Sequence, residues 1–399
     1  MQIILLTVFL DGLSFSLLLP ITPSLVQHFT GTPVSATFAM GLLIASYSFA
    51  QFIAGPIIGV LSDRYGRRPI ILLTLSIGVV DYVFSAIAWE LWLLFAARII
   101  AGVCGGNITA VNAYVADISK PEERSQKFGL VLAALAFGFI IGPGIGGYVV
   151  QWGLRTPFWI SAVLGLLNLA LAIFFLTESR PRSRVKQAFA LHMVYPLQMV
   201  LRHPSPQVRA MLRTVFFVQT ARAALQAIFV IFTFVLFDWS EADIGIALVV
   251  SGIFIVLAQG VLTKHFVDAV GNTMTALIGL TILTLGYAAL GVVSTEWQLY
   301  AALIFWSLGM ICEPAIQGAV SRRVSDAEQG VLQGNITSLT NLGWILGPIA
   351  GASLFSFAST SIDRVYLPGA PFLLCACLTL LALWQVFLVL RSPREGSKK

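Results

Sequence analysis

Long apolar runs separated by short polar stretches dominate the chain. Each run approaches the roughly 20 mainly apolar residues that an α-helix needs to cross a bilayer. The pattern therefore predicts an all-α integral membrane protein with twelve transmembrane helices. The predicted spans cover residues 3–27, 36–60, 70–89, 91–116, 126–151, 157–178, 211–237, 243–265, 272–293, 297–320, 329–357 and 367–390.

Composition supports the same class. Hydrophobic residues make up 58% of the chain and charged residues only 11%, whereas soluble domains carry about 25% charged residues. The net charge of +6 could suggest a nucleic-acid partner. The basic residues, however, lie in short loops and are not interleaved with aromatic residues as on a nucleic-acid surface. We therefore expect the lipid bilayer, and no nucleic acid, as the surroundings of this chain.

The basic residues are distributed unevenly between the two sets of loops. Of the 24 Lys and Arg residues, only Arg155 and Arg364 fall in the loops of one side, and Arg98 and Arg222 fall within spans. Basic residues favour the cytoplasmic side of a membrane. The asymmetry predicts that both termini are cytoplasmic and that the number of spans is even.

The two halves of the chain share a pattern. Gly129 and Gly334 are each followed thirteen residues later by Gly-Pro, at Gly142 and Gly347, with an offset of 205 residues throughout. Parallel repeats of this kind are typical of transporters that bind their substrate near the bilayer midplane. We predict two pseudo-symmetric six-helix halves, a linker that includes a short amphipathic helix near 189–201, and a tail. The predicted halves cover residues 1–178 and 211–390, the linker covers 179–210, and the tail covers 391–399.

The loop between the second and third predicted spans carries a specific motif, G-x-x-x-D-R-x-G-R-R. Its glycines permit a tight turn, and its acid can accept hydrogen bonds from an Arg. A plain basic cytoplasmic loop is the alternative. With this motif the chain resembles the major facilitator superfamily, which implies a gating role for the motif residues. These are Gly59, Asp63, Arg64, Gly66, Arg67 and Arg68.

The fifth predicted span is rich in glycine and contains a proline. Neighbouring helices can satisfy the backbone groups that such residues free in a bilayer, and small residues let a second helix approach closely. We predict a bendable, tightly packed helix. The pattern resembles the fifth-span motif of superfamily antiporters, which implies export. Its residues are Gly129, Gly138, Gly142, Pro143, Gly146 and Gly147.

Four charged residues within spans are candidates for proton coupling. A charge at the bilayer centre costs about 2.5–3.5 kcal/mol even on the lenient insertion scale, so it must face a partner or a cavity. The alternatives are a helix-end position for Asp11, structural hydrogen bonds for Asp81 and Glu313, and a side chain of Arg98 that reaches the interface. Arg222 could pair with one of the acids or lie at a span end.

The resemblance narrows to the tetracycline efflux branch of the drug/proton antiporters. It rests on segments such as Leu10-Asp11-Gly12, Asp81-Tyr82, Glu123-Arg124 and Gln329-Gly330. It implies that Asp11, Gln51 and Asp81 line the substrate and proton pathway, that Arg98 takes part in proton transfer, and that Arg124 belongs to the conformational motif. The family's intramembrane His and Asp align with Ile255 and Leu283, and Glu313 could supply a replacement acid.

Aromatic residues within spans could stack on a hydrophobic substrate. We name Phe216, Phe217 and Trp306 as candidate substrate contacts, together with Asp11, Gln51, Asp81 and Glu313. Packing against other helices or facing lipid is the alternative for each aromatic ring.

The leading functional prediction is a proton-coupled antiporter that exports an amphipathic organic molecule by alternating access. No Walker A loop is present, and no nucleophile–base or metal-ligand pattern stands out, so we expect neither an enzyme nor a cofactor nor a metal site. We expect a monomer in the bacterial inner membrane. The alternatives are an exporter of an endogenous metabolite or siderophore, and a membrane receptor that transports nothing.

Overall fold

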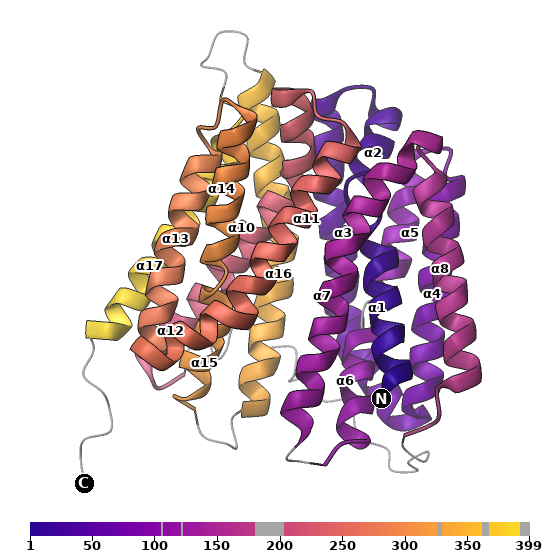
Figure 1. The fold of residues 1–399 in the computed structure, drawn as a ribbon, viewed down its shortest axis with the longest axis horizontal. Coiled ribbons are helices and arrows are strands. Elements are labelled where there is room, and N and C mark those ends of the chain that lie inside the picture. The colour runs from indigo at the N-terminus through magenta and orange to yellow at the C-terminus, as the bar shows by residue number, and fades with distance from the viewer. Residues whose placement is uncertain (105–106, 121–122, 180–202, 325–328, 361–366, 392–399) are drawn as a thin grey trace. The chain divides into compact units, whose positions relative to one another are not determined.

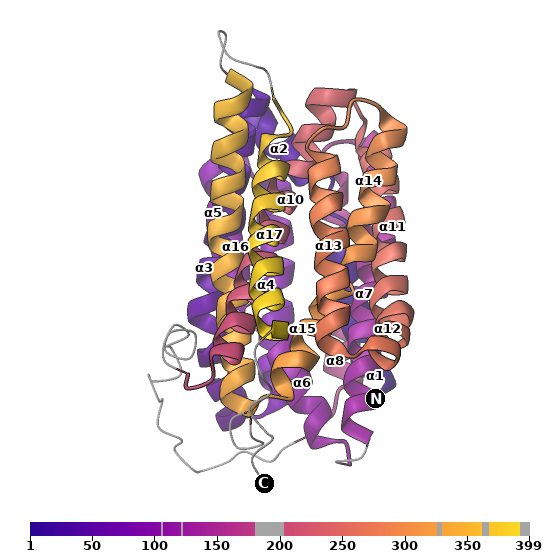
Figure 2. The same ribbon diagram turned by 90° about the vertical axis from the view of Figure 1, so that its left-hand side faces the viewer.

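A computed structural model describes residues 1–104, 107–120, 123–179, 203–324, 329–360 and 367–391 (Figures 1 and 2). All regular elements within these ranges are helices. Eleven of them are long and apolar enough to cross a membrane, and Gln2–Ser16 is a shorter apolar helix. The prediction of an all-α membrane protein is therefore confirmed. The predicted helix near 189–201 lies outside the described residues.

The chain forms two compact units. The first contains the helices up to α8 together with residues Asp238–Gly252, which include most of α11 (Glu241–Leu257). Its other helices are α1 (Gln2–Ser16), α2 (Thr22–Thr30), α3 (Pro33–Tyr65), α4 (Arg67–Ile87), α5 (Leu91–Cys104), α6 (Asn107–Asp117), α7 (Arg124–Val149), the 3₁₀ turn η2 (Val150–Trp152) and α8 (Thr156–Phe175).

The second unit contains α10 and the chain from Ile253 onward. The boundary between the units therefore falls inside α11, whereas the predicted halves divide the chain at the linker. Helix α10 starts before the predicted residue 211. The helices of this unit are α10 (Pro206–Phe237), the π-helical segment η4 (Ala258–Leu262), α12 (Thr263–Val270), α13 (Asn272–Leu290), α14 (Glu296–Gly309), α15 (Cys312–Ser321), α16 (Gln329–Thr360) and α17 (Ala370–Arg391).

The first predicted span, residues 3–27, is not one helix. It is divided into α1 and α2, and α1 ends at Ser16. A proline ring clashes with the carbonyl group four residues before it in a continuous helix. Pro20 lies four residues after Ser16, so its ring accounts for the end of α1 at this place.

The tenth predicted span is divided in the same way. Helix α14 ends at Gly309 and α15 begins at Cys312. Pro314 lies in the first turn of α15, and in a continuous helix its ring would clash with the carbonyl of Met310. The break places Glu313 in the first turn of the new helix.

Apolar side chains from four helices hold one end of the first unit together. Ile4 and Val8 of α1 pack with Ile71 of α4, Val115 of α6 and Ala172 of α8, and all five are nearly inaccessible. In the second unit α10 runs along α16 and α17, and α13 runs along α14 and α17 (Figure 2). These contacts fix the helices that carry the charged residues described next.

Candidate functional site

Asp81 and Arg98 form an ion pair inside the first unit. Asp81 lies in the interior of α4 and Arg98 in the interior of α5, and Arg98 Nη2 donates to Asp81 Oδ2 at 2.5 Å. The side chains are 3% and 13% exposed, respectively. The pair is therefore buried, and one of its carboxylate oxygens, Asp81 Oδ1, has no hydrogen-bond donor among the described residues.

Asp11 is joined to two other helices by a polar chain. Asn107 Nδ2 of α6 donates to Asp11 Oδ2 at 3.1 Å, and Thr74 Oγ1 of α4 donates to Asn107 Oδ1 at 3.0 Å. Asp11 lies well inside α1, so the alternative of a helix-end residue is wrong. The first unit thus holds two intramembrane acids, each with its own hydrogen-bond partner.

Glu313 is the centre of a second buried polar cluster, which we call the Glu313 cluster. Arg222 Nη1 of α10 donates to both of its carboxylate oxygens, at 2.9 and 3.0 Å. Gln219 Nε2 donates to Oε1 at 3.0 Å and Gln259 Nε2 donates to Oε2 at 3.1 Å. Each oxygen therefore accepts two hydrogen bonds, and Arg222 pairs with an acid instead of lying unpaired at a span end.

Two helix irregularities bring the Glu313 cluster together. Glu313 follows the break between α14 and α15, and Gln259 lies in the π-helical segment η4. A single π-turn inside an α-helix is frequently found at functional sites. Beyond the cluster, Trp344 Nε1 of α16 points at Gln219 Oε1, 3.4 Å away. The cluster therefore draws on α10, η4 and α15, with α16 behind it.

The remaining predicted substrate contacts differ in accessibility. Gln51, Phe216 and Phe217 are half-buried, and the two phenylalanine rings lie 5.8 Å apart. Trp306 is only 6% exposed, and its ring packs edge-on against Tyr287 at 6.2 Å. The prediction of Trp306 as an open stacking surface is therefore wrong for this structure: the ring fills the contact between α13 and α14.

Gly66 shapes the predicted motif loop. Its φ of 102° favours glycine, and a Cβ atom there would meet the Glu178 carboxylate. That carboxylate accepts from the backbone N–H groups of Arg67 at 2.9 Å and Arg68 at 3.2 Å. An acid that satisfies free N–H groups at a helix start is favoured by the helix dipole. Glu178 is thus a site residue that the sequence did not reveal.

Arg67 is buried and joins three side chains. Its guanidinium lies 2.7 Å from Asp63 Oδ1 and 3.0 Å from Asp117 Oδ2, and it donates to Ser62 Oγ at 3.2 Å. Arg64, in contrast, is exposed and lies 5.3 Å from the centre of the Tyr65 ring. The motif arginines therefore differ in their environment: Arg67 is buried among polar partners, and Arg64 is exposed. The Arg124 side chain lies outside the described ones.

We expect Arg67→Ala to destabilise the protein. The variant leaves Asp63 and Asp117 without their shared cation. Breaking a buried ion pair costs 3–5 kcal/mol, and we discount this to about 2–3 kcal/mol because both acids are partly exposed. Thermal unfolding in detergent should show a Tm several degrees lower. Arg64→Ala, which removes an exposed charge, is the matched control; equal Tm shifts in the two variants would contradict the assignment.

One face of α7 lies directly against α1 (Figure 1). A Cβ atom at Gly138, Gly142 or Gly146 would meet the α1 backbone between residues 9 and 17. Ser16 Oγ of α1 donates to the Gly138 carbonyl at 2.9 Å. These three glycines are therefore required by a close helix–helix contact, as the motif predicts.

The other face of α7 approaches the first turns of α11. A Cβ atom at Gly147 would meet the Glu241 carbonyl, and one at Gly245 would meet the Pro143 carbonyl. Gly129 and Gly59 behave differently, since among the described residues nothing lies within 4 Å of a Cβ atom at either position. The close packing predicted for Gly129 is therefore not found among the described residues, and Gly59 lies inside α3 instead of in the predicted turn.

The comparisons with known proteins bear on this arrangement. The Major Facilitator Superfamily family model matches residues 4–237 and 211–399. The chain belongs to the major facilitator superfamily. It is 35% identical to the Escherichia coli "Tetracycline resistance protein, class C", with 94% of each chain covered. It is 32% identical to the Pasteurella multocida class H protein, with 92% of each chain covered.

Solved structures agree on the fold. A crystal structure of a D-xylose-proton symporter has a TM-score of 0.78 and 17% sequence identity, with 100% of this chain and 98% of that chain covered. The predicted resemblance to the tetracycline efflux branch and the predicted major facilitator fold are confirmed. This facilitator is a multi-pass membrane transporter, not an enzyme.

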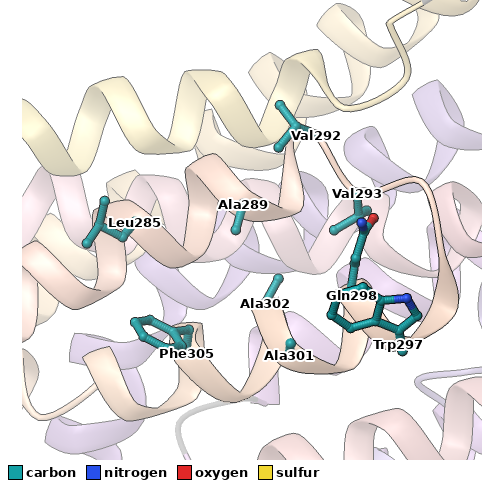
Figure 3. A pocket seen from close by; sticks show the side chains of 9 residues that line it. All are labelled: Leu285, Ala289, Val292, Val293, Trp297, Gln298, Ala301, Ala302 and Phe305. Atoms are coloured by element: carbon teal, nitrogen blue, oxygen red, sulfur yellow. The ribbon is translucent and has the colours of Figure 1, made fainter.

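This facilitator also has a hollow of about 380 Å³ along α13 and α14 (Figure 3). It carries no charged side chain. Trp297 and Val292 on its rim are 69% and 70% exposed, and Gln298 is engaged by the backbone N–H groups of Ser294 and Thr295. We therefore place no polar chemistry here. The lining residues are Leu285, Ala289, Val292, Val293, Trp297, Gln298, Ala301, Ala302 and Phe305.

Proposed function

We propose that this transporter is a proton-coupled antiporter that exports an amphipathic organic molecule by alternating access. The Asp81–Arg98 pair carries the proposal. It is a buried acid–base pair within a membrane helix bundle, with one carboxylate oxygen that lacks a donor among the described residues. Ionisable residues placed in this way in transporters mark proton pathways.

The pair has two states that differ in charge. With Asp81 ionised, Arg98 holds the carboxylate; with Asp81 protonated, the attraction between the two side chains is lost and Arg98 is free to turn to another partner. A proton that moves inward along the membrane potential gains about 2.3 kcal/mol per 100 mV. This energy can drive export if the two states favour different conformations of the helices.

We assign different roles to Asp81 and Glu313. The Asp81 side chain is 3% exposed and the Glu313 side chain 13%, and their partners Arg98 and Arg222 are 13% and 33% exposed. We therefore propose that Asp81 and Arg98 exchange the proton. We also propose substrate contacts within each unit, at Asp11 and Gln51 in the first and at Glu313, Phe216 and Phe217 in the second. We further propose that the protein lies in the bacterial inner membrane with both termini in the cytoplasm, and that it works as a monomer.

The names of the relatives favour one substrate class, and the residues of this chain at two positions favour a second. The two relatives named above are tetracycline resistance proteins, which favours a drug-like amphipathic substrate. Leu283, however, is fully buried, and its backbone packs against Gly309. An acid at that position would enter a tight helix contact. The apolar Ile255 and Leu283 thus stand where the family has a His and an Asp, and the loss of these polar groups favours, as a second candidate, an endogenous amphipathic metabolite as the exported molecule.

Inside-out membrane vesicles test the proposal. Respiration acidifies their interior, so an exporter of this kind should accumulate its substrate inside. Tetracycline, ethidium and amphipathic metabolites should be compared, with and without a protonophore that collapses both the pH gradient and the membrane potential. We expect accumulation of at least one compound that depends on the proton gradient. Binding without flux for every compound, or flux that is insensitive to the protonophore, would contradict the proposal.

Glu313→Gln should reduce proton-driven accumulation of the wild-type substrate. The variant removes the charge that balances Arg222 and leaves that cation in a largely buried cluster. The same vesicles measure the effect. Glu296→Gln, in the exposed first turn of α14, is the control and should behave as wild type. Wild-type accumulation in Glu313→Gln would remove Glu313 from the pathway.

A further inference from the structure

The Glu313 cluster is electrically neutral and partly open. Arg222 and Glu313 contribute one charge of each sign, and the two amide side chains add none. The Arg222 side chain is 33% exposed and the Glu313 side chain 13%. Both members of this ion pair are therefore more exposed than their counterparts in the Asp81–Arg98 pair, at 13% for Arg98 and 3% for Asp81.

A ligand with a single charge meets an obstacle in such a site. An anion that takes Arg222 leaves the Glu313 carboxylate unpaired, and a cation that takes Glu313 leaves the guanidinium unpaired. An unpaired charge in a low-dielectric interior is strongly unfavourable. A ligand that carries both charges avoids this penalty, because it supplies a new partner to each side chain.

From this we infer that the Glu313 cluster recognises amphipathic zwitterions, by exchanging its internal ion pair for two ion pairs with the ligand. The ligand's anionic group takes the place of Glu313 beside Arg222, and its cationic group takes the place of Arg222 beside Glu313. This inference rests on the proposed function, since it names the substrate class of the same transporter.

The surrounding groups suit such an exchange. Arg222 Nη1 lies 2.9–3.0 Å from the Glu313 oxygens, so the two ligand charges need to be close together, as they are on one carbon of an α-amino acid. The amides of Gln219 and Gln259 hold Glu313 now, and an amide can donate to an anion or accept from a cation. Half-buried Phe216 and Phe217 precede Gln219 on the same helix and offer apolar surface.

Three probes with one alkyl chain separate the possibilities: 2-aminodecanoic acid, decanoic acid and decylamine, which are a zwitterion, an anion and a cation at neutral pH. Their binding to the purified full-length protein in lipid nanodiscs is measured by calorimetry, without any proton gradient. We expect the wild type to bind the zwitterion at least about 10-fold more tightly than either of the other two probes.

Variants of the pair provide the control. Arg222→Gln/Glu313→Gln removes both charges together, which leaves no unpaired ion and preserves folding, and it should lose the preference for the zwitterion. Glu313→Gln should come to favour decanoic acid, and Arg222→Gln should come to favour decylamine. If the single variants fail to fold, the comparison between the wild type and the double variant still tests whether the ion pair causes the preference for the zwitterion.

Three results would overturn the inference: no preference in the wild type, a preference that persists in the double variant, or no binding of any probe. The outcome is independent of the vesicle experiment. A zwitterion preference without proton-driven transport would defeat the proposed function alone. Proton-driven transport without a zwitterion preference would defeat this inference alone.

Discussion

Asp81→Asn is expected to reduce proton-driven accumulation in inside-out vesicles to the level of vesicles that lack the protein. The asparagine cannot take up and release a proton, and it leaves Arg98 without its carboxylate partner in a region where that partner is 3% exposed. The coupling step is therefore removed while the substrate-facing residues are unchanged. Accumulation of the best substrate, followed over time with the gradient applied, measures this effect.

A loss of folding must be separated from a loss of coupling. Asp81→Asn/Arg98→Gln removes both charges, so that no unpaired ion remains to destabilise the bundle. It should also lack proton-driven accumulation but keep substrate–substrate exchange across vesicles without a gradient. Asp268→Asn, an exposed acid in α12, should behave as wild type. Undiminished accumulation in Asp81→Asn would place the proton site elsewhere.

Gly146→Leu is expected to prevent the accumulation of folded transporter. A Cβ atom at Gly146 would overlap the Leu17 carbonyl, which belongs to the backbone and cannot turn away. Helices α7 and α1 would have to separate along their contact. Overpacking a tight contact costs about 1–3 kcal/mol, and more where backbone must move. Size-exclusion chromatography of detergent extracts should show aggregated or missing protein.

Gly129→Leu is the matched comparison because it makes the same change in the same helix. Among the described residues nothing lies within 4 Å of a Cβ atom there. It should give a monodisperse peak and near-normal transport. If Gly129→Leu and Gly146→Leu behave alike, the loss comes from the helix itself and not from its contact with α1.

Much of the fold can be predicted from the sequence because bilayer-spanning helices are long apolar runs. The breaks in the first and tenth spans could not be found in this way. Pro20 and Pro314 each account for a helix end four residues earlier, at or next to Ser16 and Met310. Proline alone does not mark such breaks either, because Pro143 and Pro348 lie inside the continuous helices α7 and α16.

The acids and arginines of the site stand out in the sequence because charge is costly inside a membrane. Which acid pairs with which arginine, however, cannot be seen in the sequence. Asp81 and Arg98 are 17 positions apart, and Arg222 and Glu313 are 91 positions apart. Gln219 and Gln259 complete the Glu313 cluster, and Asn107 binds Asp11. Neutral amides carry no comparable penalty in a membrane, so their charge does not mark them in the sequence. Gly129 shows the converse: it fits a motif, and none of the described residues lies close enough to require a glycine there.

Proton flux driven by substrate tests the central claim most directly. The purified protein is reconstituted in liposomes that hold a pH-sensitive dye and no pH gradient, and a substrate identified in the vesicle experiment is added outside. An antiporter exchanges entering substrate for leaving protons, so the interior should become alkaline, and Asp81→Asn should abolish the change. Substrate entry with no change of internal pH in the wild type would contradict proton-coupled antiport.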